Sequence, residues 1–381
     1  RGSTSLDSMV SWPLIAQCCR KWPVAIKSYL QISQNRSLMV PVLENSEELD
    51  RRINITMQRT TLILLQLALL TLTGACGGGS GGNSTPTPEA SVNTAAQTSN
   101  TQTADECSGS GSQLDCTFNH DGLVREYILY VPQSYTGSES VPLLFNFHGY
   151  GSSAIDQMNY GDFRVLAEEE QFILLVPHGT LLEDTAHWNV GSWTSESTVD
   201  DIGFTSALID KIATDYLIDL SRIYSTGMSN GGYMSHQLAC LLSDNFAAIA
   251  SVTGSMSPET FTECTPTHAT SILQIHGTED DVVPYTGANW TKSMEAIMDY
   301  WSAYNGCDPA PSVTALPDTN EDGTIADLIA YTNCINNVEV ELYRMNEMGH
   351  TWPEPGRGWD ISGVNVIWRF LSRHSLNGVV E

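Results

Sequence analysis

The sequence predicts a single α/β domain, in which a mostly parallel central sheet is covered by helices on both faces. Strand-like runs alternate with helix-like runs over residues 107–381, and several of the strand-like runs are apolar throughout. Continuous apolar strands are typical of parallel sheets that are buried on both faces. The chain has 381 residues, which is enough for two domains, but α/β folds often use about 250 residues in one.

The residues before this domain differ from it in composition. Residues 1–56 show no sustained period and are excluded from the predicted fold. Residues 57–76 run from basic Arg59 through an apolar stretch to small residues and Cys76, which predicts a secretory signal. Its end resembles a bacterial lipobox, so we expect a lipid anchor at Cys76, with simple secretion as the alternative. Residues 77–106 lack leucine, isoleucine and aromatic residues and predict a flexible polar linker.

Within the domain, each expected element has a local reason. Strands are expected where apolar and β-branched residues run between turn residues: Val124–Val131, Pro142–Phe147, Phe172–Val176, Arg222–Ser225, Ala247–Val252, Ser271–Ile275 and Val338–Arg344. Helices are expected between most of these strands, where apolar residues recur at helical spacing: Asp162–Glu170, Gly203–Tyr216, Gly232–Leu242, Trp290–Tyr304 and Ile361–Ser372.

Charge and cysteine content limit the partners and the compartment. The chain has 44 acidic and 17 basic residues, a formal net charge of −27, which makes nucleic acid and anionic membrane surfaces poor partners for the folded part. Six cysteines lie in the domain, and an even number in an exported chain suggests disulfides. Six cysteines allow 15 connectivities. Pairing of sequence neighbours gives Cys107–Cys116, Cys240–Cys264 and Cys307–Cys334, and buried free thiols are the alternative.

The strongest motif is Gly227-Met228-Ser229-Asn230-Gly231, which lies between an expected strand and an expected helix. A serine hydroxyl becomes a useful nucleophile when a sharp strand-to-helix turn exposes it and a base can reach it. The turn also directs the backbone amide of Asn230 toward the oxygen of a carbonyl under attack. This context favours a catalytic serine over a chance match in a glycine-bearing loop.

Three further loops carry the partners that such a serine requires. An apolar strand runs into His148-Gly-Tyr150-Gly, where the amide of Tyr150 is the expected second oxyanion donor and His148 is expected to shape the loop. The loop after Ser271–Ile275 contains three acids, of which we assign Asp280 to orient the base. His350 follows the last expected strand and is the expected base. The order serine, acid, histidine is the one that this motif predicts.

Four motifs of the domain, taken together, resemble one family. They are Thr-Gly-Met-Ser-Asn-Gly-Gly, Val-Asp-Asp-Ile-Gly-Phe, His-Gly-Thr-x-Asp-x-x-Val-Pro-Tyr and Gly-His-Thr-Trp-Pro. Together they resemble the poly(3-hydroxybutyrate) depolymerase-like esterases, a family that includes LpqC-type lipoproteins and feruloyl and acetylxylan esterases. The resemblance implies an α/β-hydrolase fold over residues 107–381, a triad of Ser229, Asp280 and His350, and disulfides Cys240–Cys264 and Cys307–Cys334.

The resemblance also implies a substrate wall near the serine. It puts the loop of Trp188 and Asn189 near the acyl site, and Trp352 lies two residues from the expected base. We therefore expect these three residues to bind substrate. No zinc or nucleotide motif is present in the sequence, so no metal and no cofactor are expected. Asp318–Gly323 matches the start of a calcium loop but lacks the glutamate at position twelve, which favours an ordinary acidic turn.

The expected function is that of a serine carboxylesterase acting on an ester-bearing polymer or oligomer. A polyester of the poly(hydroxyalkanoate) type is the first expectation, and a feruloyl or acetylxylan esterase is the alternative. A noncatalytic surface lipoprotein and a serine peptidase are further hypotheses. We expect a monomer that is exported by a bacterium, either extracellular or held at the cell envelope.

Overall fold

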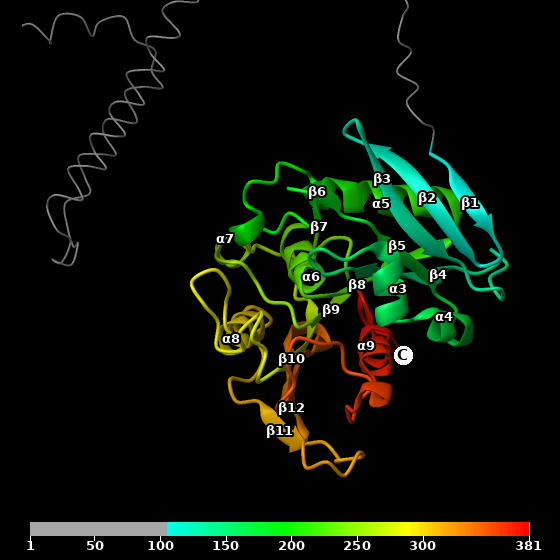
Figure 1. Cartoon of the computed structure of the whole chain (residues 1–381). Helices are drawn as coiled ribbons and strands as arrows, with labels where there is room; N and C mark the ends of the chain where they lie inside the picture. Colours follow the sequence, from blue (N-terminus) through cyan, green and yellow to red (C-terminus); the bar gives the residue numbers. More distant parts are fainter. Residues whose placement is uncertain (1–104, 381) are drawn as a thin grey trace, which may run out of the picture. The chain divides into compact units, whose positions relative to one another are not determined.

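The computed structural model describes residues 105–380 and has an α/β architecture built on one eleven-stranded sheet (Figure 1). The predicted signal at 57–76, its lipobox Cys76, the segment 1–56 and linker residues 77–104 lie outside the described residues. Asp105 and Glu106, which the sequence assigned to the linker, are already hydrogen-bonded to the second strand through Asn119 and Thr117. The folded domain therefore begins by residue 105.

The strands of the large sheet, in their order across it, are β1 (Cys107–Ser110), β2 (Gln113–His120), β3 (Leu123–Tyr130), β5 (Ile173–Pro177), β4 (Val141–Phe147), β8 (Ile218–Met228), β9 (Ala248–Val252), β10 (Ser271–Gly277), β13 (Val340–Met345), β12 (Ala326–Tyr331) and β11 (Ser312–Ala315). Two small antiparallel pairs complete the strands: β6 (Thr180–Leu182) with β7 (Thr185–His187), and β14 (His374–Ser375) with β15 (Gly378–Val379).

The centre of the large sheet is parallel and its edges are antiparallel. All pairings from β5 through β4, β8, β9 and β10 to β13 are parallel. Antiparallel strands extend this centre on both sides, with β1–β3 at one edge and β11–β12 at the other (Figure 1). The predicted parallel sheet is thus confirmed for the central strands. The strands β1, β2, β11 and β12 were not predicted. β1 and β11 are exposed along their whole length, whereas β2 and β12 are mostly half-buried or buried.

Helices cover both faces of the sheet, as predicted. They are α3 (Ala154–Tyr160), α4 (Arg164–Glu170), α5 (Asp201–Asp215), α6 (Asn230–Leu241), α7 (Pro258–Glu263), α8 (Met294–Tyr304) and α9 (Gly363–Leu371), with short 3₁₀ turns at Ser192–Thr194, Ile335–Asn337 and Pro355–Arg357. Side chains of α5, α6 and α8 pack in one core with Leu143, Phe145 and Phe147 of β4. Side chains of α3, α4 and α9 pack in a second core with Leu144. Successive residues of a strand point to opposite faces, so β4 contributes to both cores.

Three disulfides join the cysteines that are nearest in sequence: Cys107–Cys116, Cys240–Cys264 and Cys307–Cys334. These are the pairs predicted from the sequence, and the free-thiol alternative is wrong for them. In the part of the chain that the structure describes, none of the helices has the length and apolar character needed to span a bilayer.

Candidate active site

Ser229 lies at the sharp turn between β8 and α6. Its backbone has φ 52° and ψ −119°, a conformation that L-residues rarely adopt. The flanking glycines permit this turn because the end of β4 passes very close to it. A Cβ atom at Gly227 would come within 2.6 Å of the carbonyl oxygen of Phe147, and a Cβ at Gly231 would overlap the same oxygen. The Gly-x-Ser-x-Gly spacing is therefore required by the packing of β4 against the turn.

Asp280 and His350 meet in a direct hydrogen bond. The Nδ1 atom of His350 lies 2.8 Å from Oδ2 of Asp280, whose side chain is fully buried. The other carboxylate oxygen, Oδ1, accepts the backbone amides of Val282 and Val283 at 3.0 and 2.8 Å. With Oδ1 held by two donors, Oδ2 is directed at the imidazole. The Nδ1 proton of His350 is then donated to Asp280, which leaves Nε2 free to act as a base.

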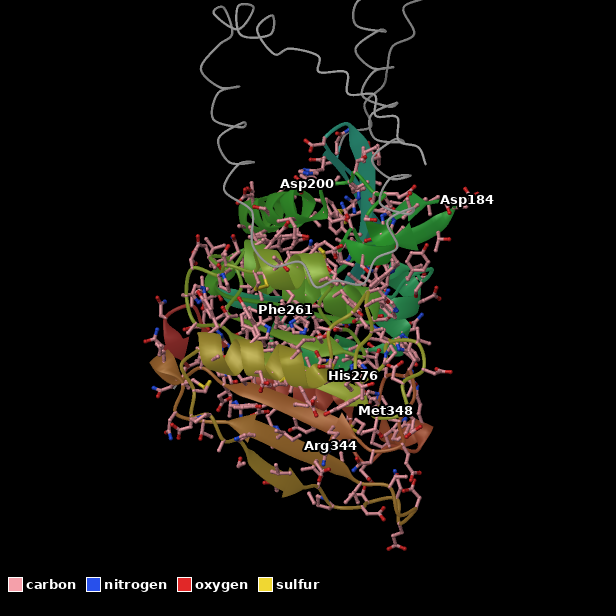
Figure 2. The ribbon with its side chains drawn as sticks, turned by 90° about the vertical axis from the view of Figure 1, so that its left-hand side faces the viewer. Asp184, Asp200, Phe261, His276, Arg344 and Met348 are labelled. Carbon is pink, nitrogen blue, oxygen red and sulfur yellow. A yellow bond between two sulfur atoms is a disulfide. The ribbon has the colours of Figure 1, made fainter. Side chains whose placement is uncertain are left out.

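The two loops that carry Asp280 and His350 lie side by side because β10 and β13 are parallel neighbours, so that their carboxyl ends are adjacent. The amide of Glu279 donates to the carbonyl of Met348 at 3.1 Å, and the amide of Thr278 donates to that of Met345 at 3.0 Å. A Cβ at Gly277 would overlap the carbonyl oxygen of Met348. Figure 2 shows His276, which precedes this glycine, and Met348 in the same region. The glycine thus permits the close contact that brings acid and base together.

The acid is ionised at neutral pH. Burial of the Asp280 carboxyl acts to raise its pKa, but hydrogen bonds from His350 and Val283 outweigh burial and hold the pKa below its ordinary value. His276 also lies 3.4 Å from Oδ2 of Asp280. Burial lowers the pKa of His276, and its Nε2 is 2.8 Å from the carbonyl oxygen of Val283, which accepts its proton. His276 is therefore a neutral structural neighbour of Asp280, and His350 is the only one of these two histidines that reaches the cavity described below.

The loop after β4 lies against the serine. A Cβ at Gly149 would lie 3.5 Å from Cβ of Ser229, so the loop backbone is in contact with the serine side chain. His148 is buried and fixes this loop: its Nδ1 is 2.7 Å from the carbonyl of Gly149, and its Nε2 accepts the amide of Gly179 at 2.9 Å. Burial lowers the pKa of His148 to about 4. A neutral imidazole that uses both nitrogens in backbone contacts shapes the loop and takes no part as a base.

Trp188 connects this loop to the serine turn. Its backbone N–H donates to Oδ1 of Asn230 at 2.7 Å, and its carbonyl accepts Nδ2 of Asn230 at 3.1 Å. Its indole N–H donates to the carbonyl of His148 at 2.9 Å. All three residues are buried. One tryptophan therefore holds both segments that were predicted to supply oxyanion donors, the amides of Tyr150 and Asn230.

A cavity of about 500 Å³ contains the reactive groups. It is lined by Gly149, Tyr150, Ser152, Asp156, Gln157, Asn159, Tyr160, Met228, Ser229 and His350. The structure thus brings Ser229, His350 and Tyr150 to one space, with Asp280 bonded behind the imidazole. Four of the lining residues come from α3, which the sequence analysis did not predict. The Ser153-x-x-Asp156 pattern of a helix start was the available signal: Ser153 Oγ accepts the amide of Asp156 at 3.2 Å.

Tyr160, at the end of α3, holds the loop of His350. Its hydroxyl lies 2.9 Å from Oγ1 of Thr351 and accepts the amide of Trp352 at 3.2 Å. The guanidinium of Arg357 lies 4.0 Å from the centre of the Tyr160 ring and adds to this packing. These contacts restrain the residues that directly follow the expected base.

Trp188, Asn189 and Trp352, the expected substrate-binding residues, do not line this cavity. Trp352 is fully buried beneath it, where its ring fits against Gly161 and Gly363; a Cβ at either glycine would come within 2.9 or 2.8 Å of the indole. Trp188 is fully buried as well. Both tryptophans position loops around the cavity rather than form its wall.

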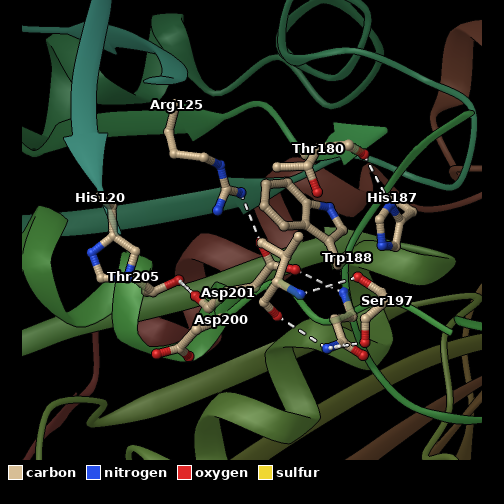
Figure 3. A network of polar contacts seen from close by, with 12 residues as sticks. His120, Arg125, Thr180, His187, Trp188, Ser197, Asp200, Asp201 and Thr205 are labelled. Carbon is tan, nitrogen blue, oxygen red and sulfur yellow. Dashed lines mark hydrogen bonds and ion pairs between the residues drawn. The ribbon is translucent and has the colours of Figure 1, made fainter. Parts of the chain in front are cut away.

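Asn189 belongs to a polar network that includes Asp201 and Arg125, which Figure 3 labels. Its backbone N–H donates to Oδ2 of Asp201 at 2.8 Å, and Oδ1 of Asp201 forms a buried ion pair with Arg125 at 2.7 Å. Asp200 instead caps α5 by accepting the amide of Gly203 at 2.7 Å. Asp201 therefore orders the loop that follows Trp188, Asp200 caps α5, and neither lines the cavity.

Two acidic groups on the surface resemble cation sites in composition. His120, Asp121 and Asp200 each place one ligand atom within 4.8 Å of the others, but Asp121 and Asp200 are exposed and no further described His, Cys, Asp or Glu joins the group. In the loop 318–323, Asp318 accepts the amides of Asp322 and Gly323. These bonds are those of an acidic turn that satisfies its own backbone.

Comparison with known proteins agrees with this geometry. A model of the phospholipase/carboxylesterase family matches residues 136–305, which include the turn of Ser229 and the loop of Asp280. The described domain has the α/β-hydrolase fold. The chain is 30% identical over 248 residues to feruloyl esterase B of Piromyces equi, covering 62% of this chain and 44% of that protein. It is 24% identical over 260 residues to a bifunctional acetylxylan esterase/xylanase of Neocallimastix patriciarum, covering 68% of this chain and 35% of that one.

The chain spans less than half of the length of these two relatives. A probable feruloyl esterase C of Aspergillus flavus is 29% identical over 192 residues, which is 49% of this chain and 64% of that protein. Among solved structures, an acetyl xylan esterase from Aspergillus awamori aligns with a TM-score of 0.48 at 15% identity, covering 65% of this chain and 93% of that one.

Proposed function

We propose that the chain is a serine carboxylesterase that removes feruloyl or acetyl groups from a plant cell-wall polysaccharide. The observation that carries the proposal is the 2.8 Å bond between Asp280 and His350, with the imidazole in the same cavity as the strained Ser229. The names of the relatives favour feruloyl and acetylxylan esters over the polyester that was our first expectation. A polyester hydrolase is therefore the second candidate function.

In the proposed mechanism, Oγ of Ser229 attacks the ester carbonyl carbon while Nε2 of His350 removes its proton. The backbone amides of Asn230 and Tyr150 donate to the oxyanion that forms. His350 then passes the proton to the leaving sugar oxygen, and the ester C–O bond breaks to leave an acyl-enzyme. Water, deprotonated by His350, attacks that acyl group and releases the free acid and Ser229. Asp280 stabilises the imidazolium in both halves of the reaction.

A panel of esters tests this proposal. Methyl ferulate, acetylated xylan, p-nitrophenyl acetate and a hydroxybutyrate oligomer are incubated with the wild type and with Ser229→Ala. We expect turnover of the first three substrates, and a loss of about 10⁶-fold in kcat for Ser229→Ala. Preferential turnover of the hydroxybutyrate oligomer would support the second candidate.

Two other classes of function are distinguished by a fluorophosphonate probe and by an amide substrate. A noncatalytic protein with this fold would leave a fluorophosphonate probe unreacted, whereas we expect the wild type to be labelled and Ser229→Ala to stay unlabelled. A serine peptidase would cleave a matched amide as well as the ester, whereas we expect this chain to cleave the ester alone.

Export is part of the proposal. Three disulfides are typical of proteins that fold in an oxidising compartment. Attachment through Cys76 remains a prediction about a residue outside the described range. Mass spectrometry of the membrane fraction of a bacterial host would detect a lipidated N-terminal Cys76.

A further inference from the structure

A second cavity, of about 390 Å³, lies beside the first across the start of α3. Ser152 and Asp156 line the first cavity, whereas the intervening Ser153, Ala154 and Ile155 line the second. The hydroxyl of Ser153 donates to Oδ2 of Asp156 at 2.6 Å, so one hydrogen bond crosses the boundary. The rest of the second cavity comes from β1, β2, β3 and the end of β5: Ser108, Asp115, Cys116, Thr117, Glu126, Tyr127, Ile128 and His178. The two cavities are therefore separated by a single helical turn.

The polar groups of the second cavity are mostly hydrogen-bond acceptors. Asp115 and Glu126 are exposed there, and ionised carboxylates only accept hydrogen bonds. The Ser108 hydroxyl donates to the carbonyl oxygen of Asp115 at 3.5 Å, and the Thr117 hydroxyl donates to that of Glu106 at 3.4 Å. The oxygens of both hydroxyls can therefore still accept a hydrogen bond. Such a surface favours a ligand that offers many donors.

One donor faces these acceptors. Nδ1 of His178 accepts the amide of Ala154 at 3.2 Å, so the proton of the neutral imidazole is on Nε2. The same bond ties His178 to the first turn of α3, the helix that supplies Asp156, Gln157, Asn159 and Tyr160 to the first cavity. Exposed Ile155 adds an apolar surface next to these polar groups. A few convergent polar groups beside an apolar surface are characteristic of small-molecule sites.

This arrangement distinguishes between the ligands that an esterase could hold. A polyester backbone carries carbonyl and ester oxygens along its length, which are acceptors and cannot bond to the carboxylates of Asp115 and Glu126. An anionic chain would be repelled by them. A neutral sugar chain carries hydroxyl groups that donate to carboxylates and also accept from His178.

We infer that the second cavity binds the sugar chain of an esterified polysaccharide while its acyl group occupies the first. This inference rests on the proposed function and names the part of the substrate that the second cavity recognises. An α-helix with its side chains is about 10 Å wide, so a substrate must extend by about that distance beyond the ester to reach both cavities. Oligosaccharide esters meet this condition, and methyl ferulate does not.

The test compares Asp115→Asn, Glu126→Gln and their double variant with the wild type. Each exchange replaces a carboxylate by an amide of the same shape at an exposed position, and Glu139→Gln, an exposed acid outside both cavities, is the matched control. We expect kcat/KM for feruloylated or acetylated xylo-oligosaccharides to fall about tenfold in the double variant, mainly through KM. For methyl ferulate and p-nitrophenyl acetate, kcat/KM should stay within twofold, and thermal unfolding should be unchanged.

Binding without turnover provides the second arm. In the Ser229→Ala background, unesterified xylo-oligosaccharides are titrated by calorimetry, and we expect binding that Asp115→Asn and Glu126→Gln weaken and Glu139→Gln does not. Equal loss of activity on small and long esters, or no loss on either, would overturn the sugar site. A loss confined to hydroxybutyrate oligomers would overturn it as well. Failure of the proposed function itself appears differently, as a wild type that hydrolyses none of the small esters.

Discussion

Replacing Asp280 by asparagine tests the geometry of the acid most directly. Oδ1 of Asp280 accepts two backbone amides, and Oδ2 accepts the Nδ1 proton of His350. An asparagine must keep its oxygen toward the two amides, since its NH₂ group there would face two donors. Its NH₂ group would then face His350, which forces the imidazole to accept at Nδ1 and to carry its proton on Nε2. That tautomer cannot remove a proton from Ser229.

We therefore expect Asp280→Asn to lower kcat by about 10⁴-fold, the size of effect known for this exchange in a serine hydrolase triad. This corresponds to about 5 kcal/mol of transition-state stabilisation. The assay is steady-state hydrolysis of p-nitrophenyl acetate together with the rate of fluorophosphonate labelling. Asp281→Asn, an exposed acid one residue away, is the control and should retain wild-type activity. A kcat for Asp280→Asn within tenfold of the wild type, in a variant that unfolds normally, would refute the assigned role.

Three further results are expected. The folded-state pKa of Asp280 lies below its ordinary value of 3.8. Its ionisation therefore stabilises the fold above pH 3.8, and this contribution is lost as the pH falls through the lower folded value. Acid unfolding, followed by circular dichroism, should show a flatter pH dependence for Asp280→Asn than for the wild type. Gly231→Ala places a methyl group against the Phe147 carbonyl and should lower the unfolding temperature strongly or prevent folding, whereas Gly356→Ala, where a Cβ meets open space, should leave both unchanged. Trp188→Phe removes the indole donor to the oxyanion loop and keeps an aromatic ring in the buried position, so kcat should fall about tenfold with little change in KM. A loss expressed mainly in KM would contradict a positioning role.

The candidates for catalysis could be found in the sequence because each one belongs to a local pattern. Ser229 is marked by glycines that the turn requires, and Asp280 and His350 each lie in the loop that follows an expected strand. The adjacency of β10 and β13 was not predicted, and this adjacency is what joins the two loops. The same local reasoning gave the central strands, most helices and the disulfide pairs.

The wall of the cavity could not be predicted in this way. Trp352 seemed suited to a substrate wall because of its position in sequence, but its burial depends on Gly161 and Gly363, which are far from each other in the chain. Tyr160 was missed because the sequence analysis expected no helix at α3. Its role follows from a contact with Thr351 that spans 191 positions. Long-range packing of this kind leaves no trace in a single sequence.

The position of β13 between β10 and β12 makes the site dependent on the last part of the chain. During synthesis, Ser229 and Asp280 emerge well before His350, and β10 keeps an unpaired edge until β13 docks beside it. Such an edge can pair with other chains. Recovery of ester hydrolysis during refolding should therefore report closure of the whole sheet, and it should lag behind any signal that comes from the elements before residue 300.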